Sequence, residues 1–156
     1  MGLVPHPNYF EYIENKIKLE IMKTPEKQYK IVILDDDNFY ASLMQKQLEQ
    51  YAYLLAMNNH CKFKVNAYTR FSDFMVDLEK DTDLIFLDYY LSEEITGDRL
   101  VKQINEKCAG CKTVIISNNR NKDTAWLSII NGADGFIHKD KTALSRSCFM
   151  IESLLK

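Results

Sequence analysis

No apolar run in this chain of 156 residues approaches the roughly 18 residues that a membrane-spanning helix needs. The N-terminus also lacks a charged region followed by an apolar core, which is the pattern of a secretory signal. The sequence therefore predicts a protein of the cytoplasm.

An excess of charge of either sign is also missing. The chain has 20 Lys and Arg against 22 Asp and Glu, a net charge of -2. These totals give no indication of a nucleic-acid or anionic-membrane partner, and we expect neither. With 46% hydrophobic and 27% charged residues, and no repeat or low-complexity tract, the composition is that of one folded domain.

The chain has four cysteines, Cys61, Cys108, Cys111 and Cys148. Cys108 and Cys111 have the spacing of a redox pair or of half a zinc site. No second CxxC or HxxxH supplies the missing ligands, and Cys61 beside His60 is a poor substitute, so a zinc site is disfavoured. The alternative is a turn around Gly110 that ends a helix and carries two reduced thiols.

Residues 1–28 form a separate N-terminal extension. Their apolar side chains recur at helical spacing, at Phe10, Ile13, Ile17 and Ile21, until Thr24-Pro25 breaks the pattern. This predicts an amphipathic helix appended to a domain of residues 29–156. The helix should pack on its own domain or on a second copy, because its apolar stripe would otherwise lie in water.

From Lys30 onward, short apolar strands alternate with helical patterns. The expected strands are 31–34, 63–69, 84–88, 113–117 and 135–138, and a helix follows each. This predicts an α/β fold, a (βα)5 doubly wound five-stranded parallel sheet. Right-handed crossovers favour the flavodoxin-like strand order 2-1-3-4-5, with 63–69 at an edge. Because the pattern ends with the fifth helix, we expect no second domain.

Two of the helices have predicted details. The helix after the first strand is expected to be capped by Asn38. One face of it is marked by Tyr40, Leu43, Met44, Gln47, Leu48 and Tyr51. The helix carrying Trp126, Ile129 and Ile130 is expected to stop at Asn131-Gly132.

Four strands end in polar side chains, which the predicted topology brings to one edge of the sheet. They are the pair Asp35 and Asp36, then Asp88, Ser117 and Lys139. Each alone can be explained as a helix cap, a turn former or a solvated charge. Ligands bind beyond the carboxyl ends of open parallel sheets, so the four together indicate a functional site.

The residue types at this edge suit phosphoryl chemistry. Carboxylates held close together raise one another's pKa values unless a hard cation such as Mg²⁺ neutralises them. With Mg²⁺ on Asp36 and Asp88, the remaining oxygen of Asp88 can attack a phosphoryl group. Lys139 would neutralise a phosphoryl oxygen, and Ser117 would hydrogen-bond another.

At these residues the sequence resembles the receiver domains of two-component response regulators, over residues 30–156. That family ends strand one in an acidic pair, strand three in the phosphoacceptor Asp, strand four in Ser or Thr and strand five in Lys. The resemblance implies that Asp88 is the phosphoacceptor, that Ser117 and Lys139 bind the phosphoryl group, and that Ser117 and Phe136 form a switch. It also implies metal ligands, namely Asp35, Asp36, Asp88 and the backbone carbonyl of Tyr90.

The loops depart from the family pattern. Ser92 stands where the family usually has proline, and Gly97 comes nine residues after Asp88 instead of eight. Asp140 replaces the proline that usually follows the lysine, which puts the expected cis peptide in doubt. Asn118 is larger than the usual residue after the strand-four hydroxyl. No departure removes a reacting group.

The resemblance implies a stand-alone receiver that accepts a phosphoryl group on Asp88 from a histidine kinase or histidine phosphotransfer protein, with Mg²⁺ as cofactor. Such a protein is a signalling domain rather than an enzyme. It catalyses only its own phosphorylation and dephosphorylation, with Asp88 and Lys139 as the catalytic groups. The response is expected on the face made by the Trp126 helix, strand 135–138 and the last helix, where a downstream target binds. A homodimer would use this face or the N-terminal helix.

Two alternatives belong to other functional classes. A pseudo-receiver would keep the fold as a protein-interaction scaffold without phosphorylation; the altered loop favours it, and the intact set of polar residues opposes it. A flavodoxin-like enzyme or flavin carrier is disfavoured, because no Gly-rich or Ser/Thr-rich phosphate loop follows the first strand.

Overall fold

The computed structural model describes residues 8–23, 26–91, 95–119 and 121–156 of the chain. The helices are α1 (Tyr9–Lys23), α2 (Asn38–Asn59), α3 (Phe71–Asp77), α4 (Gly97–Lys107), α5 (Lys122–Ile130) and α6 (Ala143–Glu152), followed by the 3-10 helix η1 (Ser153–Leu155). The strands are β1 (Lys27–Leu34), β2 (Cys61–Tyr68), β3 (Leu84–Asp88), β4 (Lys112–Ser117) and β5 (Gly135–His138).

The five strands form one parallel sheet in the order β2-β1-β3-β4-β5, which confirms the predicted α/β topology. Strand β3 lies at the centre, and all five of its residues are buried. A strand covered on both faces by helices needs such a continuous apolar run. Strand β2 lies at an edge, as its alternating pattern predicted.

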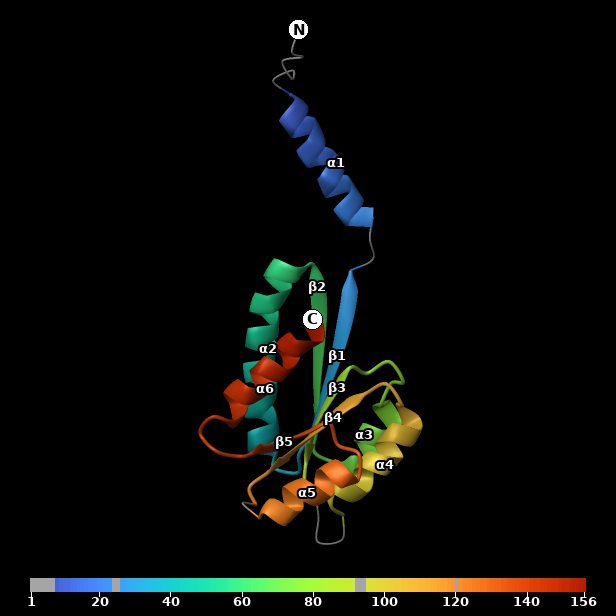
Figure 1. Cartoon of the computed structure of the whole chain (residues 1–156), viewed down its shortest axis with the longest axis vertical. Helices are drawn as coiled ribbons and strands as arrows, with labels where there is room; N and C mark the ends of the chain where they lie inside the picture. The colour runs from blue at the N-terminus through green and yellow to red at the C-terminus, as the bar shows by residue number, and fades with distance from the viewer. Residues whose placement is uncertain (1–7, 24–25, 92–94, 120) are drawn as a thin grey trace.

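Helices cover both faces of the sheet, as Figure 1 shows. Met44 and Leu48 of α2 pack with Ile151 of α6 on one face, against strand residues that include Phe86. On the other face, Phe74 of α3 and Ile104 of α4 pack against strand residues that include Ile85. Neighbouring residues of β3 therefore enter opposite halves of the core.

Helix α2 differs from its prediction in its cap and in part of its buried face. Asp37, not Asn38, caps it, because the Asp37 carboxylate accepts hydrogen bonds from the backbone amides of Phe39 (2.9 Å) and Tyr40 (3.1 Å). Its buried residues are Ala41, Met44, Leu48 and Ala52. Leu43 and Gln47 are exposed instead, since only one stripe of the helix can face the sheet.

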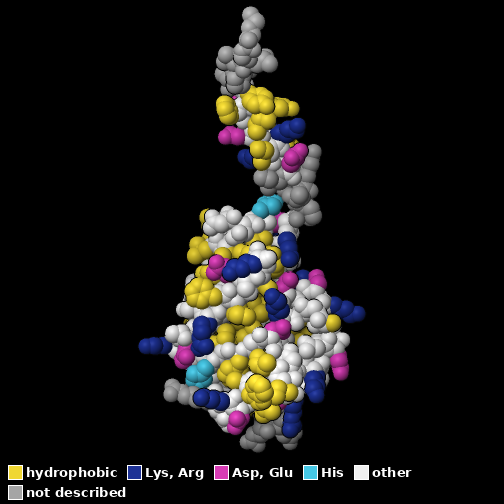
Figure 2. All heavy atoms as spheres, in the orientation of Figure 1, with side chains coloured by type: hydrophobic (Ala, Val, Ile, Leu, Met, Phe, Trp, Pro, Cys, Tyr) yellow, Lys and Arg dark blue, Asp and Glu magenta, His cyan; other side chains and the backbone are white. Residues whose placement is uncertain are grey.

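Helix α5 ends as predicted, with Gly132 in the left-handed region at φ +101°. Its apolar side chains nevertheless point outward, and Trp126 is 65% exposed. Thr124 and Ser128 are buried in their place, where the Ser128 hydroxyl donates a hydrogen bond to the Thr124 carbonyl (2.8 Å). Figure 2 shows hydrophobic side chains gathered over α5 and over α1.

The predicted N-terminal helix is present as α1, and Figure 1 shows it extending away from the sheet. Phe10 is 73% and Ile17 52% exposed, whereas Ile13 is partly buried. The side chain of Ile21 and the predicted break at Thr24-Pro25 lie outside the described residues. Its packing on a domain therefore stays a prediction. No described helix is long and apolar enough to cross a membrane.

The turn between α4 and β4 contains a disulfide between Cys108 and Cys111. Cys108 ends α4, as predicted, and its amide donates to the Ile104 carbonyl (2.7 Å). The prediction of two reduced thiols here is wrong for this structure. The turn through Gly110 brings the two Cα atoms to 5.5 Å, a separation typical of disulfides.

Candidate functional site

The carboxyl ends of four strands bring the predicted polar residues to one edge of the sheet. Asp35 directly follows β1, Asp88 and Ser117 are the last residues of β3 and β4, and Lys139 follows β5. In the register of the sheet, Asp88 pairs with Ile116, the residue before Ser117. The backbone amide of Lys139 donates to the Ser117 carbonyl (2.8 Å).

Lys139 is the centre of this group. Its Nζ lies 2.6 Å from Asp35 Oδ2 and 3.0 Å from Asp88 Oδ1. The Lys139 side chain is 7% exposed, and those of Asp35 and Asp88 are 3% and 7% exposed. Burial lowers the pKa of Lys139, but the Asp35 hydrogen bond and the two negative charges outweigh it and raise the pKa. The lysine is therefore charged and shared by two buried carboxylates.

The three acids form a cluster that can hold a cation. One oxygen each from Asp35, Asp36 and Asp88 can be chosen so that all lie within 4.8 Å of one another. Asp35 and Asp88 are buried, and Asp36 is exposed, so water can reach the cluster. Hard carboxylate oxygens together with water ligands fit Mg²⁺.

The buried carboxylates have perturbed pKa values. Burial raises the pKa of Asp88 to about 6, with a contribution from the charge of Asp35 and an opposing one from Lys139. Burial also raises the pKa of Asp35, although its hydrogen bond with Lys139 lowers it. One lysine does not fully compensate two buried acids, and a divalent cation would add the missing charge.

The loop between β3 and α4 brings Gly97 against the strand end. A Cβ on Gly97 would lie 2.7 Å from the Asp88 carbonyl oxygen, so only glycine fits. The Gly97 amide donates to the Tyr89 carbonyl (2.7 Å). An isolated bridge pairs Tyr90 with Thr96 in this loop. Ser92 lies outside the described residues.

The model of the response regulator receiver domain matches residues 31–145. The chain belongs to this family. Among curated proteins, the receiver is similar to the two-component response regulator ARR21 of Arabidopsis thaliana, with 27% identity over 110 residues. That match covers 70% of this chain and 16% of ARR21, so the chain spans about a sixth of the length of this relative.

Solved receivers share the fold. The BeF3-activated DrrB receiver domain, from Thermotoga maritima, has a TM-score of 0.65 and 18% identity, covering 82% of this chain and 97% of that one. A CheY-like receiver from Methanospirillum hungatei JF-1 has a TM-score of 0.62 and 17% identity, covering 83% and 94%. A response regulator from Burkholderia pseudomallei has a TM-score of 0.58 and 16% identity, covering 81% and 72%.

The Ser117 side chain and the Asn119 backbone amide form a turn at the end of β4 in this receiver. Ser117 is fully buried, and its Oγ accepts a hydrogen bond from the Asn119 amide (3.0 Å). Asn118, which is larger than the residue the family usually has at this position, is exposed and leaves this turn unobstructed. Phe136, the expected switch aromatic on β5, is partly buried against the core on the α3 and α4 face.

Tyr90 and Asn119 connect the loops that follow β3 and β4. Asn119 Nδ2 donates to the Tyr90 hydroxyl (2.7 Å) and to Thr124 Oγ1 (3.2 Å). Tyr90 itself is 47% exposed. Its expected backbone contact with a metal stays a prediction.

Tyr40 is a site residue whose contact with the lysine the sequence did not reveal. Its ring centroid lies 4.5 Å from Lys139 Nζ, within the range of a cation–π interaction. Its hydroxyl is buried without a hydrogen-bond partner among the described residues. The sequence feature that could have indicated this contact is the position of Tyr40 on the first turn of the helix that follows Asp35 and Asp36.

Asp140 forms the turn into α6 that the family usually makes with proline. Its carboxylate accepts hydrogen bonds from the Thr142 amide (2.8 Å) and hydroxyl (2.7 Å), and pairs with Arg146 (3.0 Å). These contacts, the Thr142 hydroxyl first, lower the pKa of Asp140 to about 2. No cis peptide bond occurs among the described residues, as the replacement suggested.

Proposed function

We propose that this receiver accepts a phosphoryl group on Asp88 from a histidine kinase or a histidine phosphotransfer protein, in a Mg²⁺-dependent reaction. The observation that carries the proposal is the Lys139 ammonium, which lies 2.6 Å from Asp35 and 3.0 Å from Asp88 beside the acid cluster. A charged lysine shared by two buried acids suits the transfer of an anionic group.

Each residue has a proposed role. Asp35, Asp36, Asp88 and the Tyr90 carbonyl would hold Mg²⁺, which supplies positive charge to neutralise phosphoryl oxygens. An oxygen of ionised Asp88 forms the new bond to phosphorus as the bond to the donor imidazole breaks. Lys139 then moves its charge from Asp88 to a phosphoryl oxygen, and the Ser117 hydroxyl donates to another.

Two similar structures support this chemistry by their descriptions. The DrrB receiver is described as BeF3-activated, and the Burkholderia pseudomallei protein as having a phosphorylated aspartic acid and a calcium ion. Both are distant relatives, so the proposal depends on the site of this chain. We infer that the domain acts only on itself, in phosphorylation and dephosphorylation.

The proposed response surface is the face made by α5, β5 and α6, which would bind a downstream target protein. Phosphorylated Asp88 would draw Ser117 inward, and Phe136 would turn toward the vacated space. Exposed Trp126 and Phe149, on α5 and α6, offer apolar contact area for the partner. Hydrogen exchange of residues 117–140 should change when beryllofluoride and Mg²⁺ are added, and unchanged exchange would contradict this response.

We propose residues 29–156 as the receiver, with β1 beginning slightly earlier at Lys27, and the cytoplasm as its location. Homodimerisation through α1 or the α5, β5 and α6 face belongs to the same proposal. The expectation that the receiver stands alone stays a prediction.

The decisive experiment is intact-mass measurement after incubation with acetyl phosphate and Mg²⁺. We expect one added phosphoryl group, lost in Asp88→Asn, and a weaker Mg²⁺ dependence in Asp36→Asn. Asp83→Asn, just before the opposite end of β3, is the matched control and should label like the parent. Full labelling of Asp88→Asn would refute the assignment, and an unlabelled parent would favour the pseudo-receiver.

A further inference from the structure

Cys108 and Cys111 lie at the edge of the sheet opposite Asp88. Cys108 is fully buried at the end of α4, and Cys111, 6% exposed, precedes the first residue of β4. We propose that this pair is a modification site, a reversible thiol–disulfide couple that exchanges with low-molecular-weight thiols and their disulfides. The proposal goes beyond phosphorylation and does not depend on it.

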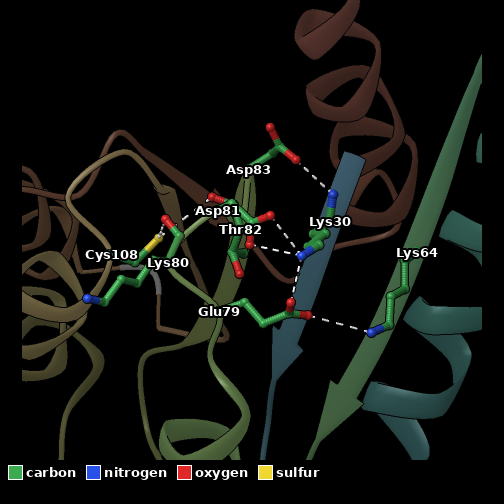
Figure 3. Close-up of polar contacts among 8 residues, drawn as sticks. All are labelled: Lys30, Lys64, Glu79, Lys80, Asp81, Thr82, Asp83 and Cys108. Carbon is green, nitrogen blue, oxygen red and sulfur yellow. Dashed lines mark hydrogen bonds and ion pairs between the residues drawn. The ribbon is translucent and has the colours of Figure 1, made fainter. Parts of the chain in front are cut away.

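The surroundings of Cys108 accommodate a reduced thiol as well as the disulfide. Its Sγ lies 3.3 Å from the Lys80 carbonyl oxygen and 3.7 Å from that of Thr82 (Figure 3). A reduced Cys108 can donate its S–H to these carbonyls, whereas a disulfide sulfur has no hydrogen to donate. Reduction therefore gains a hydrogen bond that partly offsets the lost covalent link.

The loop that supplies these carbonyls is held in place independently of the disulfide. Lys30 of β1 binds it through Nζ, at 2.6 Å from Glu79 and 2.9 Å from Asp81 (Figure 3). The Lys30 amide also donates to the Asp83 carboxylate (2.8 Å). The acceptors for the Cys108 thiol thus keep their positions in both redox states.

The exchange step balances through two thiolate attacks. A small thiolate attacks Sγ of Cys111, the more exposed of the two residues. The disulfide breaks, and Cys108 leaves as a thiolate that takes up the proton the attacking thiol gave up. A second small thiolate attacks the external sulfur of the mixed disulfide. Cys111 is released and protonated, and the reagent becomes a disulfide. Oxidation is the reverse, with that disulfide as the oxidant.

The redox state changes how firmly α4 is joined to β4. In the oxidised form the covalent bond closes the turn, which is otherwise held by backbone bonds from Cys108 to Ile104 (2.7 Å) and from Cys111 to Cys108 (3.2 Å). Gly97, the first residue of α4, packs against the backbone of Asp88, and Ser117 is the last residue of β4. The pair therefore ties together two elements that reach the candidate site.

Thiol counting after equilibration in glutathione buffers tests the proposal. With reagent removed and the protein unfolded, we expect four reactive thiols after reducing buffer and two after oxidising buffer. The two that remain are Cys61 and Cys148, buried cysteines outside the disulfide. Four thiols in every buffer, or two after excess dithiothreitol, would overturn the reversible couple.

Variants and a second measurement locate the effect. Cys111→Ser should keep three thiols in both buffers, while Cys61→Ser should still lose two on oxidation. Cys108→Ser lacks the cysteine that displaces the small thiol, so in oxidising buffer it should stop at a mixed disulfide on Cys111 and show two thiols. Amides 107–112 should exchange hydrogen several-fold faster in the reduced parent than in the oxidised parent. Equal exchange of these amides in the two states would overturn the coupling of α4 to β4.

Discussion

Among single residues, Asp88 lowers the stability of the folded protein when it is ionised, because its carboxylate is buried. Its carboxyl is buried beside Asp35, and Lys139 compensates only part of that burial, so its pKa is raised from 3.8 to about 6. Between these two pKa values the folded protein binds more protons than the unfolded chain. Its contribution to stability is therefore lost as the pH rises through this interval.

Asp88→Asn should stabilise the metal-free protein more at pH 7 than at pH 4. The uncharged amide resembles the protonated acid, so the difference between the two pH values should reach up to about 3 kcal/mol. Urea unfolding of both proteins at each pH measures it. An equal effect at pH 4 and pH 7 would mean that folding does not raise the pKa of Asp88. Asp83→Asn provides the control.

A second prediction concerns Tyr40, whose ring stabilises the charge of Lys139 while its buried hydroxyl lowers the stability of the fold. Tyr40→Phe removes the hydroxyl that is buried without a partner and should stabilise the protein by about 1 kcal/mol, with phosphorylation retained. Tyr40→Leu also removes the ring beneath Lys139 and should weaken beryllofluoride binding. Mg²⁺ binding should not change in either variant. Equal beryllofluoride affinity in the Phe and Leu variants would dismiss a role for the ring.

Among the elements, the loops that follow β3 and β4 are joined by a side-chain hydrogen bond. The Asn119 side-chain amide donates to the Tyr90 hydroxyl at 2.7 Å and also to Thr124 Oγ1 on α5. Hydrolysis of an aspartyl phosphate needs a water in line with the bond that breaks. A tyrosine two residues after Asp88 that is held by Asn119, with no carboxylate to orient that water, should make the phosphorylated form long-lived.

Tyr90→Asn should therefore accelerate loss of the phosphoryl mass in excess Mg²⁺. Tyr90→Phe keeps the ring but loses the hydrogen bond with Asn119, so its decay should lie between those of the parent and Tyr90→Asn. Decay is followed by intact mass after removal of the phosphodonor. If all three proteins decay alike, Tyr90 does not shield the site.

In the molecule as a whole, α1 is distinguished by its exposure: among its residues whose side chains the structure describes, all except Ile13 are exposed. Apolar side chains of α1 such as Phe10 and Ile17 are mostly exposed, and exposed apolar area of this kind is usually covered by a partner. Strand β1 begins only at Lys27, so the receiver sheet does not need the preceding residues.

Deletion of residues 1–26 should convert a dimer to a monomer in light scattering, or lower the thermal midpoint if α1 packs on its own domain. Glu11→Gln on α1 serves as a control, because it leaves the apolar stripe intact. If the deletion changes neither the mass nor the midpoint, α1 is a free segment and the proposed contact is wrong.

The sequence by itself predicted five strands, their order and the meeting of Asp35, Asp36, Asp88, Ser117 and Lys139 at one edge, although β1 begins four residues and β2 two residues earlier than predicted. These follow from local patterns, because parallel strands with right-handed crossovers necessarily bring their carboxyl ends together. The end of α5 at Gly132 was equally local, since a left-handed residue there favours glycine.

Only the tertiary structure decided how the helices turn and which side chains meet across elements. Leu43 and Trp126 are exposed because the rotation of a helix depends on the sheet beneath it, which is distant in sequence. The contact of Tyr40 with Lys139 joins the first helix after β1 to the end of β5. That Cys108 and Cys111 are close enough to form a disulfide depended on the path of a turn, since spacing in sequence does not set the distance between two sulfur atoms.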